Sequence, residues 1–390
     1  MPNSNNYTKS ICILMPHFFS ERVGGVEIQT YLIAKHLAKR TWDVHFIAQT
    51  LFPEKIGSVT VLDGIHVHWI KKRTLFSFFR QDISRLLKSI NPALIYQRGR
   101  SFFTSSPAGY RFAQRYRKSL IYHCAENNDL VMSFSRQEVI QSKKNILKKT
   151  ILYIHAFLSD YFFNSTMEKS NLVIAQTHEQ TSRLKEKRNI AAHVIPSSHE
   201  IPPADIQKDA PPIVFWIAHA GRRKRLELFV ELAKQLQGRP IQFLFAGTIP
   251  HEQYKNEIFS QTKELSNIQY IGPLTWIESN RMFAKASVFV NTTLPDREGF
   301  PNTYIQAWLH ETPVVSLNYD PDGIIEKNGL GFHSRSFDQL VVDVLQLIEN
   351  EELRRKMGVK ARAYAMENHD IEKSADVMND LLMKLLSRGL

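Results

Sequence analysis

One stretch of the sequence combines an acid with the features of a helix start. It reads REGFPNTYIQAW and covers residues 297–308. Glu298 precedes Gly299, which permits close backbone approach, and Pro301 suits the first turn of a helix. A carboxylate at this point accepts hydrogen bonds from ligand hydroxyls, and a helix N-terminus offers free N–H groups to an anion. The backbone amides placed to do so belong to Phe300, Asn302 and Thr303.

The same stretch carries a neutral amide one helical turn further on. Gln306 follows Asn302 by four residues, so both side chains lie on one side of the expected helix. This spacing makes Gln306 the edge of the site that Glu298 begins. The alternative is a capping glutamate and a surface glutamine, which leaves the sequence EGFPN unexplained.

A run of four cations follows the apolar segment 213–217. Arg222, Arg223, Lys224 and Arg225 repel one another unless they are solvated or bound to an anion. One interpretation is a solvated basic turn. The other is a clamp for a diphosphate, in which a cation stabilises the charge of a departing nucleotide. The position just after an expected strand favours the second interpretation.

Two further candidates lie in the first half of the chain. Gly24 and Gly25 stand between an apolar run and an expected helix, which suits a seat for phosphate or sugar hydroxyls. The pattern is not GxGxxG, and a simple turn remains the alternative. His123 ends an expected strand, where a functional and a structural histidine are equally compatible with the sequence.

Composition limits the class of protein. The chain has 390 residues and a formal net charge of +12, which favours anionic partners without choosing among them. Nucleic acid is not expected, because no recognised binding motif accompanies the charge. The two cysteines exclude a disulfide framework and argue against a zinc cluster. With no secretion signal and no membrane span in view, we expect a cytoplasmic protein.

Two basic and apolar stretches are candidates for contact with an anionic membrane surface. They cover residues 71–90 and 143–163, and both have apolar residues at helical spacing with cations between them. A location at the inner face of the cell membrane would follow. Both stretches also fit ordinary helices that cover a sheet, and this alternative stays open.

The order of elements predicts an α/β fold with two doubly wound, Rossmann-like domains. A helix over 26–40 separates the first two of the expected strands, which implies parallel pairing. The proline-rich segment 195–212 then interrupts the pattern, which starts again after it. Ligands in such folds bind beyond the carboxyl ends of the strands. The expected strands are 11–15, 44–48, 65–70, 93–97, 120–123, 172–176, 213–217, 242–246, 287–291 and 313–317.

Five segments together resemble the family 4 retaining glycosyltransferases of the GT-B fold, also called glycosyl transferases group 1. They are GGVEIQTYLIAKHL, SNLVIAQTHEQTSRL, REGFPNTYIQAWLHETPVV, DGIIEKNGLGF and ENHDIEKSADVMNDLL, and they span nearly the whole chain. The resemblance implies an acceptor-side domain at 1–200, a linker at 201–212 and a nucleotide-sugar domain at 213–368. A helix within 369–390 would pack back on the first domain.

The resemblance also assigns roles to the candidate residues. Glu298 would contact hydroxyls of the donor sugar, and the amides of residues 299–302 would hold sugar or phosphate. Residue 306 would meet the nucleotide ribose, and Lys224 would neutralise the diphosphate. His123 would reach the sugar from the opposite domain, across a cleft, and the Gly24–Gly25 loop would border phosphate and acceptor. The donor would be a nucleotide-diphosphate sugar of UDP or GDP type, with no metal and no other cofactor.

Two departures from the family pattern bear on activity. Gln306 stands where the family has a second glutamate, and a neutral amide accepts hydrogen bonds from ribose more weakly, by roughly 1–2 kcal/mol. His219 stands where the family has an arginine, for which Arg222 or Arg223 would substitute. The resemblance as a whole implies a retaining hexosyltransferase acting on a glycan or lipid-linked acceptor in polysaccharide or glycoconjugate synthesis. The alternative is a GT-B-like protein that binds nucleotide sugar or glycan without transferring it.

Overall fold

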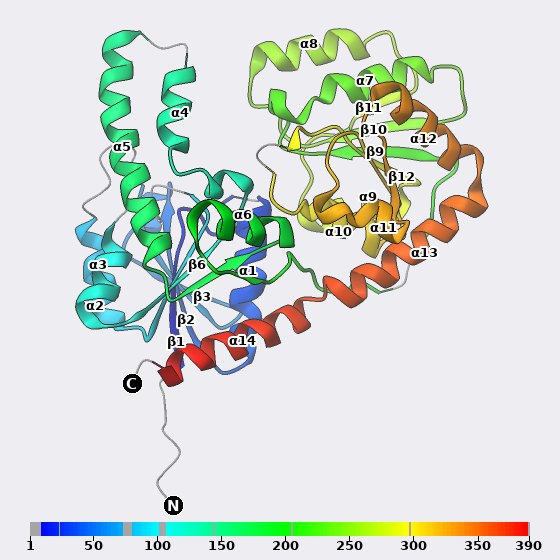
Figure 1. The fold of residues 1–390 in the computed structure, drawn as a ribbon. Coiled ribbons are helices and arrows are strands. Elements are labelled where there is room, and N and C mark those ends of the chain that lie inside the picture. The colour runs from blue at the N-terminus through cyan, green and yellow to red at the C-terminus, as the bar shows by residue number, and fades with distance from the viewer. Residues whose placement is uncertain are drawn as a thin grey trace, which may run out of the picture. The chain divides into compact units, whose positions relative to one another are not determined.

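The computed structural model describes residues 9–22, 24–72, 80–100, 107–142, 145–203, 206–295 and 298–388. The chain divides into two compact units, shown as a ribbon in Figure 1. Unit 1 comprises residues 1–197 and 371–390, and unit 2 comprises residues 198–370. Both are parallel α/β structures, which confirms the predicted fold class.

Unit 1 is built on an eight-stranded sheet in the order β3-β4-β2-β1-β5-β6-β7-β8. All neighbouring strands pair in parallel except β3 and β4. The strands are β1 Ser10–Leu14, β2 Asp43–Thr50, β3 Val59–Leu62, β4 Ile65–Lys71, β5 Leu94–Arg98, β6 Ser119–His123, β7 Leu172–Ala175 and β8 His193–Val194. The helices are α1 Gly25–Lys39, α2 Gln81–Ile90, α3 Pro107–Tyr116, α4 Phe134–Gln141, α5 Ile146–Glu168, α6 His178–Arg188 and α14 Ile371–Arg388.

The helices of unit 1 cover the sheet because each has an apolar stripe. On one side, α2 and α3 bury Ile83, Leu87 and Phe112 against strand residues such as Ile95. The C-terminal helix α14 returns to unit 1 and packs on α1, and Arg40 just after α1 forms ion pairs with Glu372 and Asp376 of α14. The prediction that a terminal helix crosses back to the first domain is confirmed.

Unit 2 is built on a six-stranded, fully parallel sheet in the order β11-β10-β9-β12-β13-β14. The strands are β9 Ile213–Ile217, β10 Gln242–Ala246, β11 Ile268–Tyr270, β12 Val288–Asn291, β13 Val314–Ser316 and β14 Gly331–His333. The helices are α7 Leu226–Gln235, α8 Glu252–Thr262, α9 Trp276–Lys285, α10 Asn302–Leu309, α11 Ile324–Asn328, α12 Phe337–Glu349 and α13 Glu351–Asn368. Short 3-10 turns include η3 Arg222–Lys224.

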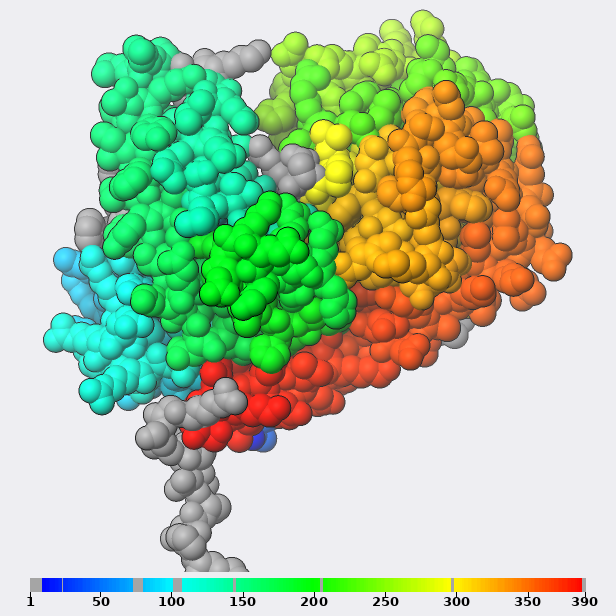
Figure 2. Space-filling model, viewed as in Figure 1, coloured from blue at the N-terminus to red at the C-terminus, as the bar shows by residue number. Residues whose placement is uncertain are grey.

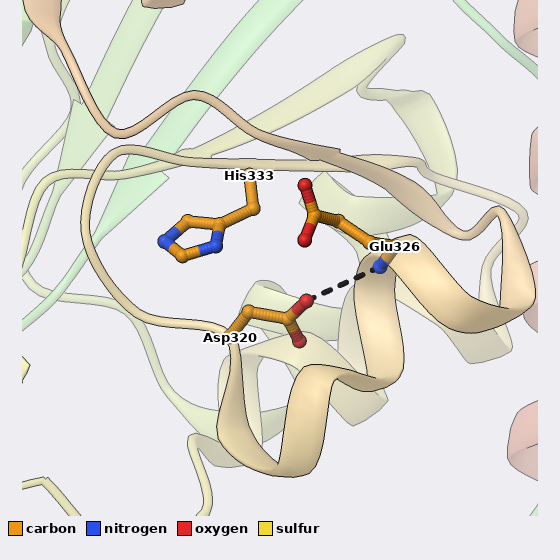
Figure 3. A group of neighbouring side chains, drawn as sticks. All are labelled: Asp320, Glu326 and His333. Carbon is orange, nitrogen blue, oxygen red and sulfur yellow. Dashed lines mark hydrogen bonds between the residues drawn. The ribbon is translucent and has the colours of Figure 1, made fainter.

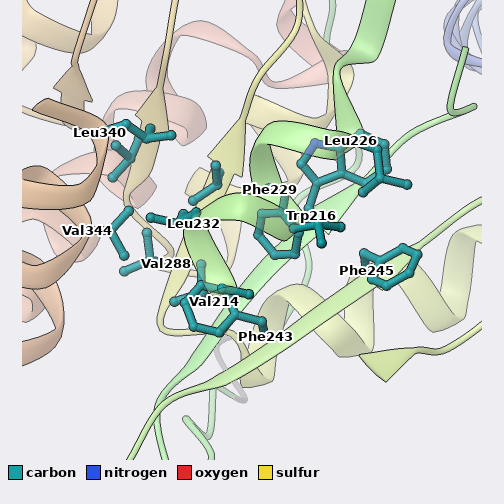
Figure 4. Packing of buried hydrophobic residues seen from close by; sticks show 14 of the residues in the cluster. Val214, Trp216, Leu226, Phe229, Leu232, Phe243, Phe245, Val288, Leu340 and Val344 are labelled. Atoms are coloured by element: carbon teal, nitrogen blue, oxygen red, sulfur yellow. The ribbon is translucent and has the colours of Figure 1, made fainter. Parts of the chain in front are cut away.

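Two apolar layers sandwich the sheet of unit 2. Figure 4 shows one of them, in which Val214 and Phe243 of the sheet meet Phe229 of α7 and Leu340 of α12. On the other side the indole of Trp308, on α10, is fully buried with Phe289 and Ala361. These layers fix the strands whose carboxyl ends carry the candidate residues.

The segment before β9 has no regular secondary structure but is fastened to unit 2. The Lys208 ammonium donates to the carbonyl of His310 (2.7 Å) and to the hydroxyl of Thr312 (2.8 Å). The Arg362 guanidinium donates to the carbonyl of Pro202 (2.9 Å). Residues 201–212 were predicted as a linker, and Ala204 and Asp205 within it lie outside the described residues.

Each strand predicted from the sequence is present, but four short strands and the four helices α3, α4, α9 and α11 were not predicted. β3, β8, β11 and β14 are two to four residues long, so their apolar pattern is too brief to recognise. The helix α9 begins with a capping box formed by Thr275 and Glu278. In β14, a Cβ on Gly331 would lie 1.9 Å from the carbonyl oxygen of Val314, so only glycine fits.

We predict that Gly331→Ala lowers the free energy of unfolding by about 2 kcal/mol or more, because the φ of +148° and the close carbonyl both oppose a side chain. Urea denaturation of the full chain measures this change. Gly221→Ala is the matched control, since Gly221 has a φ of −77° and open space around it. Equal stability of the two variants would contradict the prediction.

Candidate active site

The candidate residues of unit 2 lie at the point where its strand order reverses. β9 has β10 on one side and β12 on the other, and the chain runs outward from β9 in both directions. At such a switch point the loops after the two central strands diverge and leave room for a ligand. The loop after β9 contains the basic run, and the loop after β12 leads to Glu298.

One threonine joins these two loops. The Thr292 hydroxyl accepts from the indole N–H of Trp216 (3.0 Å) and donates to the carbonyl of Lys224 (2.6 Å). The carbonyl of Thr292 in turn accepts from Nε of Arg225 (2.8 Å). Arg225 has a φ of +47°, which turns the chain sharply between the basic run and α7. The basic run is thereby held against the end of β12.

This arrangement brings Lys224 and Glu298 together. The Lys224 ammonium donates to Oε1 of Glu298 at 2.7 Å, although the residues are 74 positions apart in the chain. The two side chains are 27% and 18% exposed, so both are accessible to a ligand from solvent. A cation from the end of β9 and a carboxylate from the end of β12 therefore lie side by side within one unit, a contact that was not predicted from the sequence.

The other cations of the run point elsewhere. Arg222 forms a two-pronged ion pair with Glu257 of α8 (both contacts 2.9 Å) and lies over the ring of Tyr254. Arg223 approaches the carbonyl of Leu294 at 3.5 Å. His219 makes a 2.5 Å hydrogen bond with the hydroxyl of Thr248 in the loop after β10. Of the predicted cationic residues, Lys224 is the one that contacts Glu298.

A buried network supports the segment Glu298–Asn302. The carbonyl of Gly299 accepts from the Tyr319 hydroxyl (2.9 Å), and the Tyr304 hydroxyl donates to the carbonyl of Tyr319 (2.8 Å). Phe300 is buried against Trp308 and His369. Pro301 occupies the N-cap position of α10 and makes no side-chain cap hydrogen bond to that helix. Its first-turn residues, Asn302 and Thr303, are half-buried.

Gln306 has a structural partner that the sequence did not reveal. Its side chain is buried and its amide nitrogen donates to Oδ1 of Asn280 (2.8 Å) and, more weakly, to Ser279 (3.3 Å), both on α9. The side chain thus links α10 to α9. Arg297, the first residue of the stretch REGFPNTYIQAW, lies outside the described residues.

Unit 1 presents its own polar groups at the corresponding switch point, between β1 and β5. His123 ends β6 beside Arg98, which ends β5, and both side chains are buried. The Tyr96 hydroxyl lies 2.7 Å from Nδ1 of His123, while Nε2 has no hydrogen-bond partner among the described residues. Burial, assisted by the Arg98 charge, lowers the pKa of His123 well below its ordinary value. Burial thus favours the neutral imidazole, whose Nε2 has no partner among the described residues.

Arg98 and Glu27 are polar residues near the strand ends of unit 1 that were not predicted as site residues. The Nε and Nη1 atoms of Arg98 are buried without a partner in the described part of the chain. Glu27 lies in the first turn of α1, two residues after Gly25, and burial raises its pKa. Gly24 occupies the N-cap position in an extended conformation and supplies no side-chain cap. For Arg98, the only signal in the sequence was its position directly after the apolar segment 93–97.

A separate group of side chains in unit 2 has the residue types of a metal site. Asp320, Glu326 and His333 bring ligand atoms within 4.8 Å of one another (Figure 3), next to a cavity of about 400 Å³. Both carboxylate oxygens of Glu326 are bound by Arg335, one at 2.7 Å. The Asp320 carboxylate accepts the backbone N–H groups of Ile325 and Glu326. These contacts give both carboxylates a structural role, Asp320 at the start of α11 and Glu326 between α11 and Arg335 after β14.

The GT-B class of protein is defined by two doubly wound α/β domains. Both units of this chain have that fold, and each carries polar groups at the ends of its central strands. Comparison with known families agrees with this class. The model described as Glycosyltransferase Family 4 matches residues 23–198, and that described as Glycosyl transferases group 1 matches residues 211–350. Together they match most of the chain, which therefore belongs to the GT4-type glycosyltransferases.

Solved structures share the fold over nearly the full length. Sucrose-phosphate synthase from Thermosynechococcus elongatus has a TM-score of 0.76 at 14% identity, covering 97% of this chain and 100% of that one. A glycosyltransferase from Rickettsia africae has a TM-score of 0.72 at 18% identity, covering 98% and 99%. HepE from Anabaena, solved with UDP-glucose, has a TM-score of 0.70 at 16% identity, covering 96% and 99%. No curated protein gives a significant match.

We predict that Glu298→Gln changes the free energy of unfolding by less than about 1 kcal/mol, because a partly exposed ion pair contributes little to stability. Urea denaturation of wild type and variant measures the difference. A loss of about 3 kcal/mol or more would instead identify the Lys224–Glu298 pair as a structural element of unit 2.

Proposed function

We propose that this glycosyltransferase uses a nucleotide-diphosphate sugar as donor and that unit 2 binds it. The observation that carries the proposal is the Lys224–Glu298 pair at the switch point of the unit 2 sheet. A cation and a carboxylate side by side offer complementary contacts to the two halves of such a donor. Lys224 would bind the diphosphate, and Glu298 would accept hydrogen bonds from the sugar hydroxyls.

The same residues account for a transfer reaction. As the bond from the anomeric carbon to the diphosphate oxygen breaks, negative charge develops on the departing nucleoside diphosphate. Lys224 and the N-terminus of α10 would stabilise that charge. The acceptor oxygen would bond to the anomeric carbon on the same face, which retains the configuration. Its proton would pass to an oxygen of the leaving diphosphate.

The other candidate residues have proposed roles in binding. The amides of residues 299–302 would hold sugar or phosphate, and Gln306 would border the ribose. Asn302 and Thr303 stand at the start of α10, where an anionic oxygen would be favoured. In unit 1, the free nitrogen of His123 suits a hydrogen bond to a sugar hydroxyl. The Gly24–Gly25 turn, with Arg98 close by, suits a phosphate or the acceptor.

The solved structures of similar fold support a class of donor substrate. HepE has been solved with UDP-glucose and with UDP, which supports a UDP-type donor with a hexose, and GDP remains the alternative base. We infer a glycan or lipid-linked acceptor, a metal-independent reaction and a place in polysaccharide or glycoconjugate synthesis. Cys12 and Cys124 are buried free thiols, in keeping with a cytoplasmic location.

A second candidate function is binding of nucleotide sugar or glycan without transfer. Gln306 favours it, because the amide is engaged with Asn280 and carries no charge with which to bind ribose. His219, hydrogen-bonded to Thr248, points the same way. Measurable donor binding with no release of nucleoside diphosphate from any common donor would support this candidate.

We predict that Lys224→Ala and Glu298→Ala each lower turnover by roughly 100-fold or more while the protein stays folded. The assay is release of nucleoside diphosphate, with the donor chosen by thermal stabilisation across a panel of UDP and GDP sugars. Arg239→Ala and Glu349→Ala serve as controls, because they break an exposed ion pair elsewhere in unit 2. Near-normal rates in both site variants would overturn the assignment.

A further inference from the structure

The helical hairpin formed by α4 and α5 carries a surface that the glycosyltransferase reaction does not use. α5 has 23 residues, and only its C-terminal half is anchored. Phe163 and Met167 are fully buried in a core cluster with Tyr122 and Val173. None of the residues from Ile146 to Ile154 is buried. In Figure 1 this half of α5, together with α4, extends beyond the sheet of unit 1.

An ion-pair cluster fixes the hairpin where it leaves unit 1. Asp160 of α5 is buried and accepts from the guanidinium groups of Arg100 (2.8 Å) and Arg136 (3.0 Å). It also accepts the backbone N–H groups of Ser135 and Arg136 at the start of α4. The two helices are therefore held in one geometry, and their outer faces are presented as a pre-organised surface.

The exposed half of α5 carries an apolar stripe. Leu147, Ile151 and Ile154 are separated by four and three residues, which places them on one face of the helix. Leu147 and Ile154 are 72% and 58% exposed. A contiguous apolar surface of this kind marks an interaction site in a soluble protein. Its further members, which complete the stripe, are Ile146, Phe157 and Tyr161.

A shallow apolar groove continues the stripe towards α4. It has a volume of about 280 Å³ and lies between Val139 and Ile140 of α4 and the first turns of α5. The side chains from α5 that line it are Ile146, Lys149, Thr150, Tyr153 and Ile154. Figure 2 shows the hairpin in space-filling form at the upper left. Both helices contribute apolar side chains to the groove, Val139 and Ile140 from α4 and Ile146 and Ile154 from α5.

The charge around the stripe identifies its partner. Residues 134–154 contain four lysines and one acid, Glu138, besides Arg136, whose charge is paired with Asp160. Lys148 and Lys149 lie on α5, and Lys143 and Lys144 precede it, outside the described residues. An excess of positive charge repels a second copy of the same surface but attracts anionic headgroups. Apolar and aromatic side chains on one face with lysines beside them are the pattern of an interfacial helix.

We propose that the tip of the α4–α5 hairpin docks on the surface of an anionic lipid bilayer, with the apolar stripe inserted among the headgroups and the lysines bound to phosphates. This docking is independent of the nucleotide-sugar site. No helix in the described part of the chain is long and apolar enough to cross a bilayer, so contact would be peripheral.

The second stretch that the sequence suggested for membrane contact behaves differently. In α2, Ile83 and Leu87 are buried against the sheet, as expected of a covering helix. Residues 75, 76 and 79 of that stretch lie outside the described residues. The surface on α4–α5 is therefore the one that the described structure supports.

Flotation of the full chain with vesicles tests the proposal. We expect wild type to float with vesicles of 70% phosphatidylcholine and 30% phosphatidylglycerol at low salt, at least about tenfold more than with phosphatidylcholine alone. Raising the salt to about 0.5 M would release most of the protein. Failure of wild type to float with the anionic vesicles at low salt would overturn the proposal.

Matched variants separate the stripe from the general positive charge of the chain. Leu147→Ser/Ile151→Ser is expected to reduce flotation by about tenfold or more, because exposed apolar side chains drive insertion. Val59→Ser/Val61→Ser is the control, since these valines are also exposed but lie on β3. Equal flotation of the two variants would contradict a role for the stripe.

Two further measurements test whether the lysines bind anionic lipid and whether the stripe instead binds a second copy of this chain. Lys148→Glu/Lys149→Glu is expected to lose the preference for anionic vesicles. Sedimentation velocity of wild type is expected to show the same oligomeric state as Leu147→Ser/Ile151→Ser. A wild-type dimer that this variant disrupts, without any flotation, would assign the surface to self-association and overturn the proposal. Circular dichroism and thermal melting confirm that every variant is folded.

Discussion

The candidate site depends on how Thr292 joins the ends of two parallel strands. Its hydroxyl is shared between Trp216 and Lys224, and its carbonyl holds Arg225, so the loops after β9 and β12 form one unit. Parallel pairing puts both strand ends at the same edge of the sheet, and the reversal of strand order leaves the space beside them open. A lysine and a glutamate distant in sequence can then meet without a long or strained connection.

In unit 1, polar side chains also lie at the carboxyl ends of parallel strands, but some of their polar atoms have no hydrogen-bond partner among the described residues. Nε2 of His123 and two nitrogens of Arg98 are buried without a partner in the described part of the chain, and each costs roughly 1–3 kcal/mol if nothing satisfies it. The sheet and its covering helices supply the stability that tolerates this cost. Unsatisfied polar groups gathered at a switch point are what a binding surface requires, because a ligand can complete the network.

The sequence predicted the strands and the positions of Glu298 and Lys224, because long apolar runs and the residues that follow them are local signals. It did not predict the partners of Arg222 and Gln306. Those side chains contact Glu257 and Asn280, on helices whose placement depends on the whole sheet. Arg98 was overlooked for a similar reason, since its burial arises from neighbouring strands. The short strands β11 and β14 had too few residues to show a period.

The chain enters and leaves unit 2 at adjacent points. The N–H of His199 donates to the carbonyl of His369 (2.9 Å), and a β-bridge joins His199 to Asp370. Residues 198–370 are thus an insertion within a unit that contains both chain termini. An insertion whose ends already touch can be exchanged as one piece with little loss of chain entropy in either parent. Recombination is therefore expected to exchange unit 2 as one piece while leaving the sheet and terminal helix of unit 1 intact.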